Sequence, residues 1–402
     1  MSIRILHVDL DAFFVEVCRQ VNPELRDVEL LVVGGRRDQR GVVQSASYGA
    51  RRYGIHSGMP IARAVALCPQ ATFYQGEFSN YRKASRVVRQ ILREFSPTVV
   101  MASLDEAYLD FSGTDRLHPV SLLPVAEDIR DRVHDQIGLD CSVGIGPNRM
   151  TAKMASEAAK PRGLLEVRPG WEERFLAGFP LSAIPGIGPK ASRRLADLGL
   201  NDVVQIQRME LGELERLLGR GAKSLKRRAH AQTGSVLRGG ELPKSVSRET
   251  TLGQDTMDRE RLERLLSLFT ARIAGQLRGE GLMARTVGLK LRHGDFRTIT
   301  RQHTLPQPTD LDHELRQSVR DLFDRAWSEV IRRKQGVRLI GVSASNLIPA
   351  EAPDLFEPPA RTQRRLLTAA VDQVRDRFGF DAVRPASIVN MKRPRRDDED
   401  AG

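Results

Sequence analysis

The sequence predicts an α+β protein of several domains, and three observations support this fold class. The chain has 402 residues, too many for a single hydrophobic core, so two to four domains are expected. Residues 171–235 read as short helices opened by glycine-rich turns. The segment 245–343 alternates in the order β-α-β-β-α-β, which is typical of a ferredoxin-like domain. Its predicted elements are strand 245–251, helix 258–278, strands 285–292 and 297–304, helix 311–333 and strand 337–343.

Composition narrows the class of protein. Hydrophobic residues make up 40% of the chain, and no apolar run reaches the roughly 18 residues that a membrane span needs. We find no signal peptide or lipidation motif and therefore expect a cytoplasmic protein without a membrane partner. The cysteines Cys18, Cys68 and Cys141 lie far apart without paired spacing, so neither a zinc site nor a disulfide framework is expected.

The net charge of +12 is unevenly distributed along the chain. Residues 1–170 are nearly neutral, whereas residues 171–346 carry most of the positive charge. A polyanion that is held by the middle of the chain and processed by its front would need this division. From charge alone, a generally basic soluble protein is the alternative.

Two acidic residues, Asp105 and Glu106, mark the most informative stretch. They lie between two strand-like segments, 97–102 and 107–111. Adjacent residues on a regular strand point to opposite faces, so a shared site requires them to lie at or beside a hairpin tip. Carboxylates on an exposed rim suit a hard cation such as Mg²⁺. The alternative for an isolated acidic pair is a solvated turn.

The N-terminal segment adds a third carboxylate. Residues 3–8 read as a buried strand, and Asp9 and Asp11 follow before a helix begins at 12–17. Asp11 is expected to be the N-cap of this helix, whereas Asp9 has no comparable local role. If Asp9 and the other two carboxylates lay within about 4 Å, each pair would repel by roughly 4 kcal/mol at an effective dielectric near 20. Such a group favours a dication, as in two-metal phosphoryl transfer.

Five stretches together reveal a family resemblance. They are HVDLDAFF (7–14), SASYGAR (45–51), SLDEAYLD (103–110), AKP (159–161) and IPGIG (184–188). Each is weak alone, but all five occur in register over roughly residues 1–345. The sequence thus resembles the Y-family translesion DNA polymerases, most closely the bacterial polymerase IV branch.

The resemblance implies a right-hand polymerase fold with a palm, small fingers, a helix-hairpin-helix thumb and a ferredoxin-like little finger. The expected boundaries are a palm at 1–170 with a fingers insertion at about 19–77, a thumb at 171–235, a linker at 236–244, a little finger at 245–346 and a C-terminal tail at 347–402. Such a protein would bind primer–template DNA and deoxynucleoside triphosphates, and we expect a monomer.

The resemblance also implies the reaction. Asp9, Asp105 and Glu106 would be the catalytic carboxylates and, with the Leu10 carbonyl, would hold two Mg²⁺ ions. The enzyme would be a template-directed, low-fidelity DNA polymerase that extends a primer 3′-OH during translesion synthesis. Two alternatives remain at this stage: a DNA-binding scaffold without catalysis, and a two-metal nuclease that shares the acids.

Several residues are candidates for nucleotide contacts. Tyr48 and Arg51 share a face if their segment is helical, and their side chains can bind phosphate oxygens there; the alternative is a solvated surface helix. The resemblance places Lys160 on the phosphates, with Ser45 assisting. It makes Phe14 the steric gate, a ring that tolerates deoxyribose and clashes with a ribose hydroxyl. The alternative for Phe14 is core packing.

Two regions are candidates for DNA contacts. Gly186, Gly188 and Lys190 lie in a glycine-rich turn that opens a helix, where backbone N–H groups can approach a phosphate. This pattern looks like a helix-hairpin-helix. In the predicted strand that contains Lys290 and Arg292, apolar residues alternate with polar and basic ones, which gives one basic face.

The C-terminal tail matches the family less well. Residues 353–356 resemble the end of a sliding-clamp-binding peptide, with Leu355 and Phe356 as its apolar residues, but the usual leading glutamine is absent. A sliding clamp is therefore a candidate partner, and an ordinary linker is the alternative. A helix is expected at 362–378, and the charge blocks at 392–400 are typical of a disordered tail.

Overall fold

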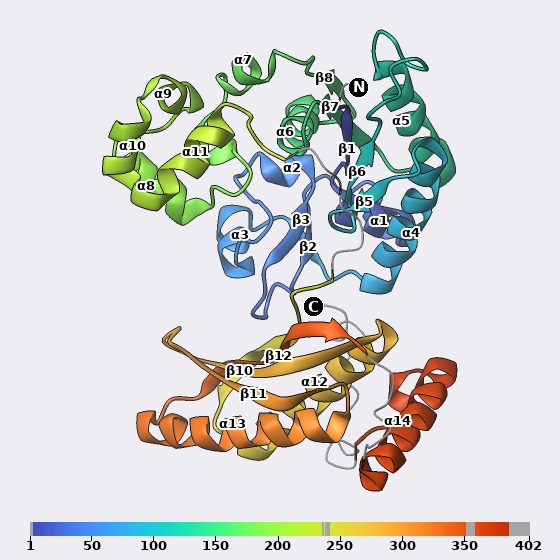
Figure 1. Ribbon diagram of the computed structural model, residues 1–402, viewed down its shortest axis with the longest axis vertical. Coiled ribbons are helices and arrows are strands. Elements are labelled where there is room, and N and C mark those ends of the chain that lie inside the picture. Colours follow the sequence, from blue (N-terminus) through green and yellow to red (C-terminus); the bar gives the residue numbers. More distant parts are fainter. Residues whose placement is uncertain (1–2, 235–236, 238–241, 351–357, 386–402) are drawn as a thin grey trace. The chain divides into compact units, whose positions relative to one another are not determined.

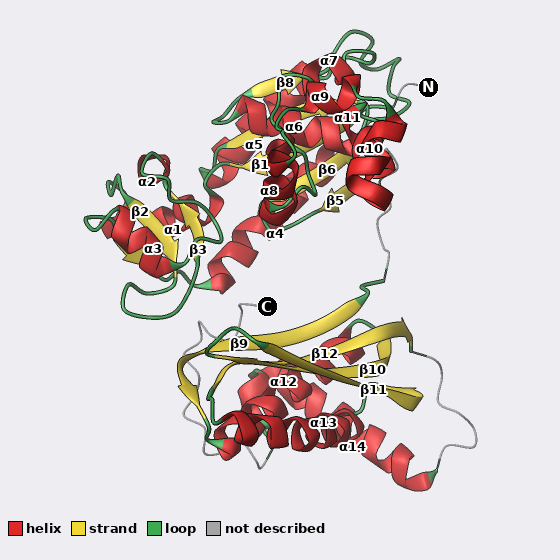
Figure 2. Cartoon of the chain, turned by 90° about the vertical axis from the view of Figure 1, so that its left-hand side faces the viewer, coloured by secondary structure: helices red, strands yellow, loops and turns green. Residues whose placement is uncertain are grey.

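The computed structural model describes residues 3–234, 237, 242–350 and 358–385. Contacts divide the chain into two compact units, each described here by itself (Figures 1 and 2). Unit 1 comprises Met1–Val33, Val43–Ser57 and Leu67–Gly240, and unit 2 comprises Gly34–Val42, Gly58–Ala66 and Glu241–Gly402. Within the described ranges, every helix is too short or too polar to cross a membrane.

The main sheet of unit 1 has five strands in the order β5-β6-β1-β7-β8. These are β1 (Ile5–Leu10), β5 (Val99–Met101), β6 (Glu106–Asp110), β7 (Cys141–Gly146) and β8 (Leu164–Glu166). Strand β1 pairs antiparallel with both β6 and β7 and is buried along its whole length. The apolar run that predicted a buried strand therefore forms the centre of the sheet.

Side chains of β1 alternate between two layers. The apolar side chains of Leu6, Val8 and Leu10 pack into a core with three helices on one face of the sheet. The three helices are α1 (Phe13–Val21), α4 (Phe78–Phe95) and α5 (Leu123–Ile137). This core holds the strand in place and leaves its other side free for polar groups.

The opposite side of β1 carries His7 and Asp9, and helix α6 (Arg149–Ala159) covers it. A glycine in β7 makes this close packing possible. A Cβ atom added to Gly144 would lie 2.0 Å from the carbonyl oxygen of Ala152, so any larger residue would push α6 off the sheet. The packing brings polar side chains of α6 over the end of β1.

A smaller sheet has three strands in the order β3-β2-β4, with β2 and β4 parallel. Its strands are β2 (Leu31–Gly34), β3 (Val43–Ala46) and β4 (Thr72–Tyr74). The short helices in this part of the chain are η1 (Pro23–Leu25), α2 (Tyr48–Arg51) and α3 (Ile61–Leu67). Helix α2 contains Tyr48 and Arg51, so their segment is helical, and the Ser47 side chain caps it by accepting a hydrogen bond from the Ala50 backbone N–H.

Short helices follow the main sheet in unit 1 and share an apolar core with α6. They are α7 (Glu172–Leu176), η2 (Leu181–Ala183), α8 (Pro189–Asp197), α9 (Val203–Arg208), α10 (Leu211–Leu218), η3 (Gly219–Gly221) and α11 (Ala222–Ala229). Gly186, in the turn before α8, has φ 89, a left-handed conformation that favours glycine. The predicted glycine-rich turn and its helix are therefore present.

Unit 2 contains an antiparallel sheet of four strands in the order β11-β10-β12-β9. Helices α12 and α13 cover one face of it (Figures 1 and 2). Its elements are β9 (Ser245–Thr256), α12 (Arg259–Gly279), β10 (Leu282–His293), β11 (Thr298–Thr309), α13 (Asp312–Arg333) and β12 (Val337–Pro349). The predicted β-α-β-β-α-β order is confirmed.

Three strands of unit 2, β9, β11 and β12, run five or six residues beyond their predicted ends. Strand β11 contains Pro306 and Pro308, which interrupt a strand pattern in the sequence. It lies at the edge of the sheet, where a proline removes no required ladder bond. Non-local pairing therefore extends strands that local sequence patterns end early.

A C-terminal helix, α14 (Pro359–Phe378), with the single turn η4 (Phe380–Ala382) after it, confirms the predicted helix. Ion pairs join α14 to the rest of unit 2. The Arg278 guanidinium binds both Asp372 carboxylate oxygens at 2.5 and 2.9 Å, and Arg361 Nε lies 3.0 Å from Glu314.

Phe323→Ala should destabilise unit 2 by about 3–5 kcal/mol, because Phe323 is fully buried in the core between α12, α13 and the sheet. Trp327 lies 5.4 Å from the Phe323 ring and is itself buried, so its fluorescence reports unfolding of this unit in urea. Phe296→Ala is the matched control, since Phe296 is 64% exposed and its loss should change stability by less than about 0.5 kcal/mol. Equal losses for both variants would contradict the assigned core.

Candidate active site

A pocket of about 280 Å³ opens in unit 1 where β1 ends. Its lining combines carboxylates, cationic side chains, small polar groups and an aromatic wall. The lining residues are Asp9, Leu10, Ala12, Phe13, Phe14, Gln44, Ser45, Arg51, His56, Ser57, Asp105, Glu106 and Lys160. Most of the predicted metal-binding and nucleotide-binding residues thus meet at one place, although they come from distant parts of the chain.

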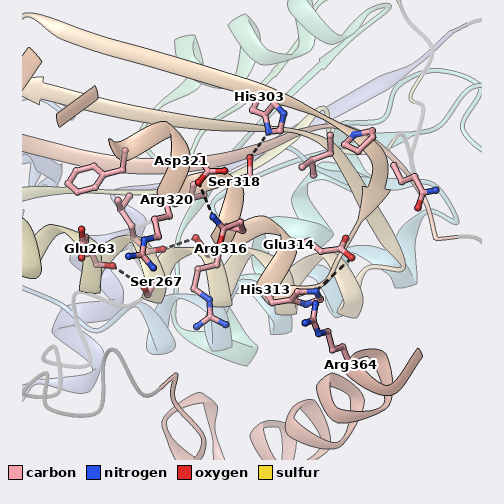
Figure 3. A pocket seen from close by; sticks show the side chains of 18 of the residues that line it. Glu263, Ser267, His303, His313, Glu314, Arg316, Ser318, Arg320, Asp321 and Arg364 are labelled. Carbon is pink, nitrogen blue, oxygen red and sulfur yellow. Dashed lines mark hydrogen bonds and ion pairs between the residues drawn. The ribbon is translucent and has the colours of Figure 1, made fainter. Parts of the chain in front are cut away.

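A larger cavity, about 1180 Å³, lies in unit 2 against α12, β11 and α13 (Figure 3). Many of its polar groups already have partners. The Gln317 amide donates to Asp321 at 2.9 Å, and the His303 ring lies 3.0 Å from the Ser318 hydroxyl. No predicted catalytic residue lines it. Chemistry, and not size, therefore identifies the smaller pocket as the candidate site.

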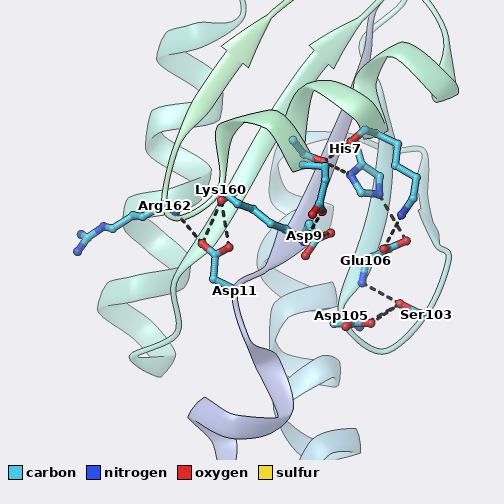
Figure 4. A network of polar contacts seen from close by, with 12 residues as sticks. His7, Asp9, Asp11, Ser103, Asp105, Glu106, Lys160 and Arg162 are labelled. Carbon is cyan, nitrogen blue, oxygen red and sulfur yellow. Dashed lines mark hydrogen bonds and ion pairs between the residues drawn. The ribbon is translucent and has the colours of Figure 1, made fainter. Parts of the chain in front are cut away.

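Strand register brings the carboxylates together. Asp9 on β1 lies directly opposite Glu106 on β6, and the Leu10 backbone N–H donates to the Asp105 carbonyl oxygen at 2.9 Å. Asp105 and Glu106 lie where the β5–β6 hairpin turns, as predicted. The Ser103 hydroxyl holds this turn by bonding the Asp105 carboxylate and accepting the Glu106 backbone N–H (Figure 4).

Two lysines, Lys153 on α6 and Lys160 directly after it, neutralise the paired carboxylates. Lys160 Nζ lies 2.9 Å from Asp9 and 2.7 Å from Glu157, and Lys153 Nζ donates to Glu106 at 2.5 Å. Lys160 is the C-cap residue of the helix, with extended backbone. Behind Glu106, the buried His7 ring bonds the Ser156 hydroxyl at 2.6 Å, and its Nε2 lies 3.7 Å from the Glu106 carboxylate.

The two facing carboxylates have opposite pKa shifts. Burial raises the pKa of Asp9 to about 6; Lys160 opposes this effect, and the neighbouring Glu106 and Asp105 charges add to it. The His7 imidazole, together with Lys153, lowers the pKa of Glu106 to about 2. Glu106 is thus stably ionised, whereas an ionised Asp9 requires a nearby cation.

The donor set fits a hard divalent cation. Among the described residues, no three His, Cys, Asp or Glu side chains converge on one point at metal-binding distance. Asp105 is turned toward Ser103, and lysine ammonium groups lie against Asp9 and Glu106. The three carboxylates and the Leu10 carbonyl nevertheless border one pocket, and oxygen donors of this kind suit Mg²⁺.

The predicted nucleotide-binding residues have distinct positions. Arg51, Ser45 and Lys160 line the pocket, and the Arg51 guanidinium lies 4.8 Å from the centre of the Tyr48 ring, so the expected shared face exists. The Tyr48 hydroxyl, however, donates to Asp11 at 3.0 Å. Burial, with the Asp11 charge, raises the pKa of this hydroxyl, so it stays protonated as a donor.

The two adjacent phenylalanines separate as expected. Phe13 is buried in the core of unit 1. Phe14 is half-buried and lines the pocket, with its ring edge-on to Tyr81 at 4.7 Å between centroids. The Phe14 ring is therefore available to contact a bound molecule.

The prediction that Asp11 is the N-cap of α1 is wrong. The N-cap position is Ala12, with φ 44 and ψ 37, and no side chain caps the helix. Asp11 is buried and instead accepts hydrogen bonds from the Tyr48 hydroxyl, the Ser142 hydroxyl and the Arg162 backbone N–H. These donors lie 37, 131 and 151 residues away, and together they outweigh one local capping bond.

The predicted DNA-contact residues lie in two places. Gly186, Gly188 and Lys190 form the turn and first residues of α8 in unit 1, and the Lys190 side chain is exposed. In unit 2, Lys290 pairs with Glu249 at 2.7 Å, and Arg292 Nε donates to Thr298 at 2.9 Å. The candidate clamp-binding residues Leu355 and Phe356 lie outside the described residues.

Sequence reasoning missed His7 and Lys153. A signal for Lys153 was present, because it precedes Lys160 by two helical turns. His7 lies two residues before Asp9 and therefore shares its face of β1. No sequence signal indicated Ser142 or Arg162 as partners of Asp11.

Comparisons with known proteins identify the family of the chain. Residues 8–157 match the impB/mucB/samB family, and residues 243–355 match the C-terminal domain of that family. The chain is 40% identical over 396 residues to a DNA polymerase IV of Dehalococcoides mccartyi strain CBDB1, covering 98% of this chain and 99% of that protein.

Two solved structures are similar at 25% identity. A Y-family DNA polymerase chimera, Dbh-Dpo4(243-245)-Dbh, matches with a TM-score of 0.71 over 86% of this chain and 99% of that chain. An insertion ternary complex of Dbh DNA polymerase matches with a TM-score of 0.61 over 87% of this chain and 100% of that chain.

Asp9→Asn should stabilise the metal-free protein. The pKa of Asp9 is raised to about 6, so between about pH 4 and pH 6 the folded protein binds more protons than the unfolded chain. The free energy of unfolding therefore falls as pH rises through this window. Asparagine removes that penalty, and we expect a gain of about 1–3 kcal/mol at neutral pH that shrinks toward pH 4.

Urea denaturation in EDTA at neutral and at acid pH measures this gain. Asp128→Asn is the control, because Asp128 is an exposed carboxylate on α5 that pairs with the equally exposed Arg132, and its loss should change stability little. A pH-independent loss of stability in Asp9→Asn would contradict the assigned cost of burying an ionised Asp9.

Proposed function

The chain belongs to the Y-family DNA polymerases, in the DNA polymerase IV group, and on this basis we propose that the pocket at the end of β1 is its nucleotidyl-transfer site. The protein is a DNA-directed DNA polymerase of the translesion class. One observation carries the proposal: Asp9 and Glu106 face each other across two strands, in a pocket that Arg51 and Lys160 also line.

In the proposed reaction, the 3′-OH of a primer attacks the α-phosphate of a deoxynucleoside triphosphate and pyrophosphate leaves. Asp9, Asp105, Glu106 and the Leu10 carbonyl would hold two Mg²⁺ ions, which supply Lewis-acid activation of the hydroxyl and neutralise the triphosphate. Glu106 is suited to its role because it stays ionised at any pH near neutrality.

Positive side chains orient the phosphates. Lys160 already lies between the pocket and the exposed Glu157, so its ammonium group can leave Asp9 for a phosphate without moving its helix. Arg51 and Ser45 border the same space, and Tyr48, packed under the Arg51 guanidinium, completes the group. The bidentate geometry of arginine suits phosphate oxygens.

Phe14 is proposed as the steric gate. Its ring lines the pocket at the second residue of α1, and Tyr81 supports it edge-on, so the ring cannot retreat without disturbing the core. A wall of this kind selects deoxyribose because a 2′-hydroxyl would collide with it.

The turn at Gly186 and Gly188 with Lys190, and the sheet face that carries Lys290 and Arg292, are proposed to bind the backbone of primer–template DNA. The helical segment and unit 2 would then act as thumb and little finger. Backbone contacts of this kind predict binding that weakens with salt and depends little on sequence. Sliding-clamp binding, low fidelity, the monomeric state and the cytoplasmic location stay predictions.

Asp105→Ala should lower primer extension by more than about a hundredfold, because it removes an oxygen donor from the catalytic pocket. Gel analysis of a labelled primer, with the DNA dissociation constant measured in parallel, separates catalysis from binding, which should change less than about twofold. Asp128→Ala is the control and should extend normally. Extension by Asp105→Ala at the wild-type rate would refute the proposed site.

Phe14→Ala should raise ribonucleotide insertion relative to deoxynucleotide insertion by about tenfold or more, because the wall against the 2′-hydroxyl is lost. Single-nucleotide insertion kinetics with each sugar measure the ratio. Phe13→Leu changes the neighbouring buried ring and should lower stability while leaving the sugar ratio intact. An unchanged ratio of ribonucleotide to deoxynucleotide insertion in Phe14→Ala would contradict the assignment of Phe14 as the steric gate.

A further inference from the structure

Asp11 is a buried carboxylate that no step proposed above uses. Its side chain is within bonding distance of three donors, and Figure 4 shows one of them, Arg162, beside it. Oδ1 lies 3.0 Å from the Tyr48 hydroxyl, and Oδ2 lies 2.7 Å from the Arg162 backbone nitrogen. The Ser142 hydroxyl lies 3.1 and 3.0 Å from the two oxygens. A buried charge needs hydrogen-bond donors of this kind. The segments that supply these donors indicate what Asp11 holds together.

Two of these donors belong to segments that carry proposed phosphate contacts. Tyr48 lies on α2 with Arg51, and its ring packs against the Arg51 guanidinium. Arg162 lies two residues after Lys160, in the turn that follows α6. The Ser142 hydroxyl comes from β7, next to β1 in the sheet, so it anchors the carboxylate to the rigid core.

The main chain at Asp11 is also constrained. The Asp11 backbone N–H donates to the Asp140 carbonyl oxygen at 2.9 Å. The next residue, Ala12, has φ 44, a left-handed conformation that is costly for a residue with a Cβ atom. This turn starts α1 and carries the chain to Phe14. Backbone strain of this kind persists only where the surrounding structure enforces it.

We propose that Asp11 is a positioning residue that sets both triphosphate affinity and sugar discrimination. One carboxylate joins the Tyr48–Arg51 helix, the turn after Lys160 and the strained turn that presents Phe14. The three groups therefore keep fixed positions relative to one another. This inference rests on the proposed polymerase function and adds to it a residue that touches neither metal nor nucleotide.

Asparagine tests the inference with little change in volume. A carboxylate accepts hydrogen bonds at both oxygens, whereas an amide accepts at one and donates at the other. In Asp11→Asn, the amide oxygen can stay on the Arg162 N–H, and the NH₂ group then faces the Tyr48 hydroxyl, which must reverse its hydrogen bond. Both links become neutral hydrogen bonds in place of charge-assisted ones and are therefore weakened, while the residue stays in place.

The experiment measures single-nucleotide insertion by the full chain with deoxy- and ribonucleotides, the DNA dissociation constant and the melting temperature. For Asp11→Asn we expect KM for the deoxynucleotide to rise about tenfold, with kcat changed less than about threefold. The ribonucleotide-to-deoxynucleotide ratio of kcat/KM should rise about tenfold although Phe14 is intact. DNA affinity should change less than about twofold.

Asp140→Asn is the matched control. The Asp140 carboxylate also lies beside Arg162, 3.5 Å from its guanidinium Nε, but it has no link to Tyr48. This variant should keep the wild-type KM and sugar ratio. Tyr48→Phe removes one link from the other side, and adding it to Asp11→Asn should raise KM by less than the product of the two separate effects.

Two results would overturn the inference. One is an Asp11→Asn variant with kinetics like those of Asp140→Asn; the other is a fall in melting temperature and kcat with unchanged KM and sugar ratio, which indicates a structural role alone. If Asp11→Asn does not fold, Ser142→Ala is the second variant, because it keeps the carboxylate but removes one of its hydrogen bonds and lets it rotate. We expect KM and the ribonucleotide-to-deoxynucleotide ratio to rise about threefold in this variant. An unchanged ratio would count against the inference. Primer extension tests the proposed function separately. If the wild-type protein extends the primer and Asp105→Ala does not, the proposed function holds even where the inference about Asp11 fails.

Discussion

The burial of the Asp9 carboxylate opposite Glu106 is the constraint on which the rest of the candidate site depends. Strand register fixes the two carboxylates opposite each other, and Asp9 is buried whereas the Glu106 side chain stays partly exposed. Without a divalent cation, Lys160 and Lys153 supply the compensating charge. Their helix can approach the sheet only because Gly144 leaves room for it. The fold thus stabilises a charge arrangement that a cation would stabilise further.

The same arrangement explains how one pocket serves several tasks. Asp9 and Lys160 pair with each other. A cation would bind Asp9, and the phosphates of a nucleotide would bind Lys160, so both would replace this ion pair. Lys160 takes part in both sets of contacts, since it bonds Asp9 and lines the pocket. Phe14 bounds the same space on its apolar side. The proposed catalysis and the proposed substrate selection therefore depend on one group of residues at the ends of β1, β6 and α6 and at the start of α1.

Much of the fold and of the candidate site could be predicted from the sequence, because the patterns that indicate them are local. The buried strand before Asp9, the hairpin around Asp105 and the strand–helix order of unit 2 each lie within one short segment. Asp11 was misassigned because its donors are 37 to 151 residues away, and a capping pattern is the only signal visible nearby. His7 was missed for the same reason, since its partner Ser156 lies 149 residues on. The extra length of β11 was hidden by Pro306, which an edge strand tolerates.

The most direct test of the central claim is a crystal structure of the protein with primer–template DNA, a deoxynucleoside triphosphate and Mn²⁺ in place of Mg²⁺, with the metal located by its anomalous scattering. The account predicts anomalous peaks coordinated by Asp9, Asp105 and Glu106, with Lys160 moved from Asp9 to the phosphates. Metal bound by the triphosphate alone, with the Lys160–Asp9 and Lys153–Glu106 pairs intact, would contradict it.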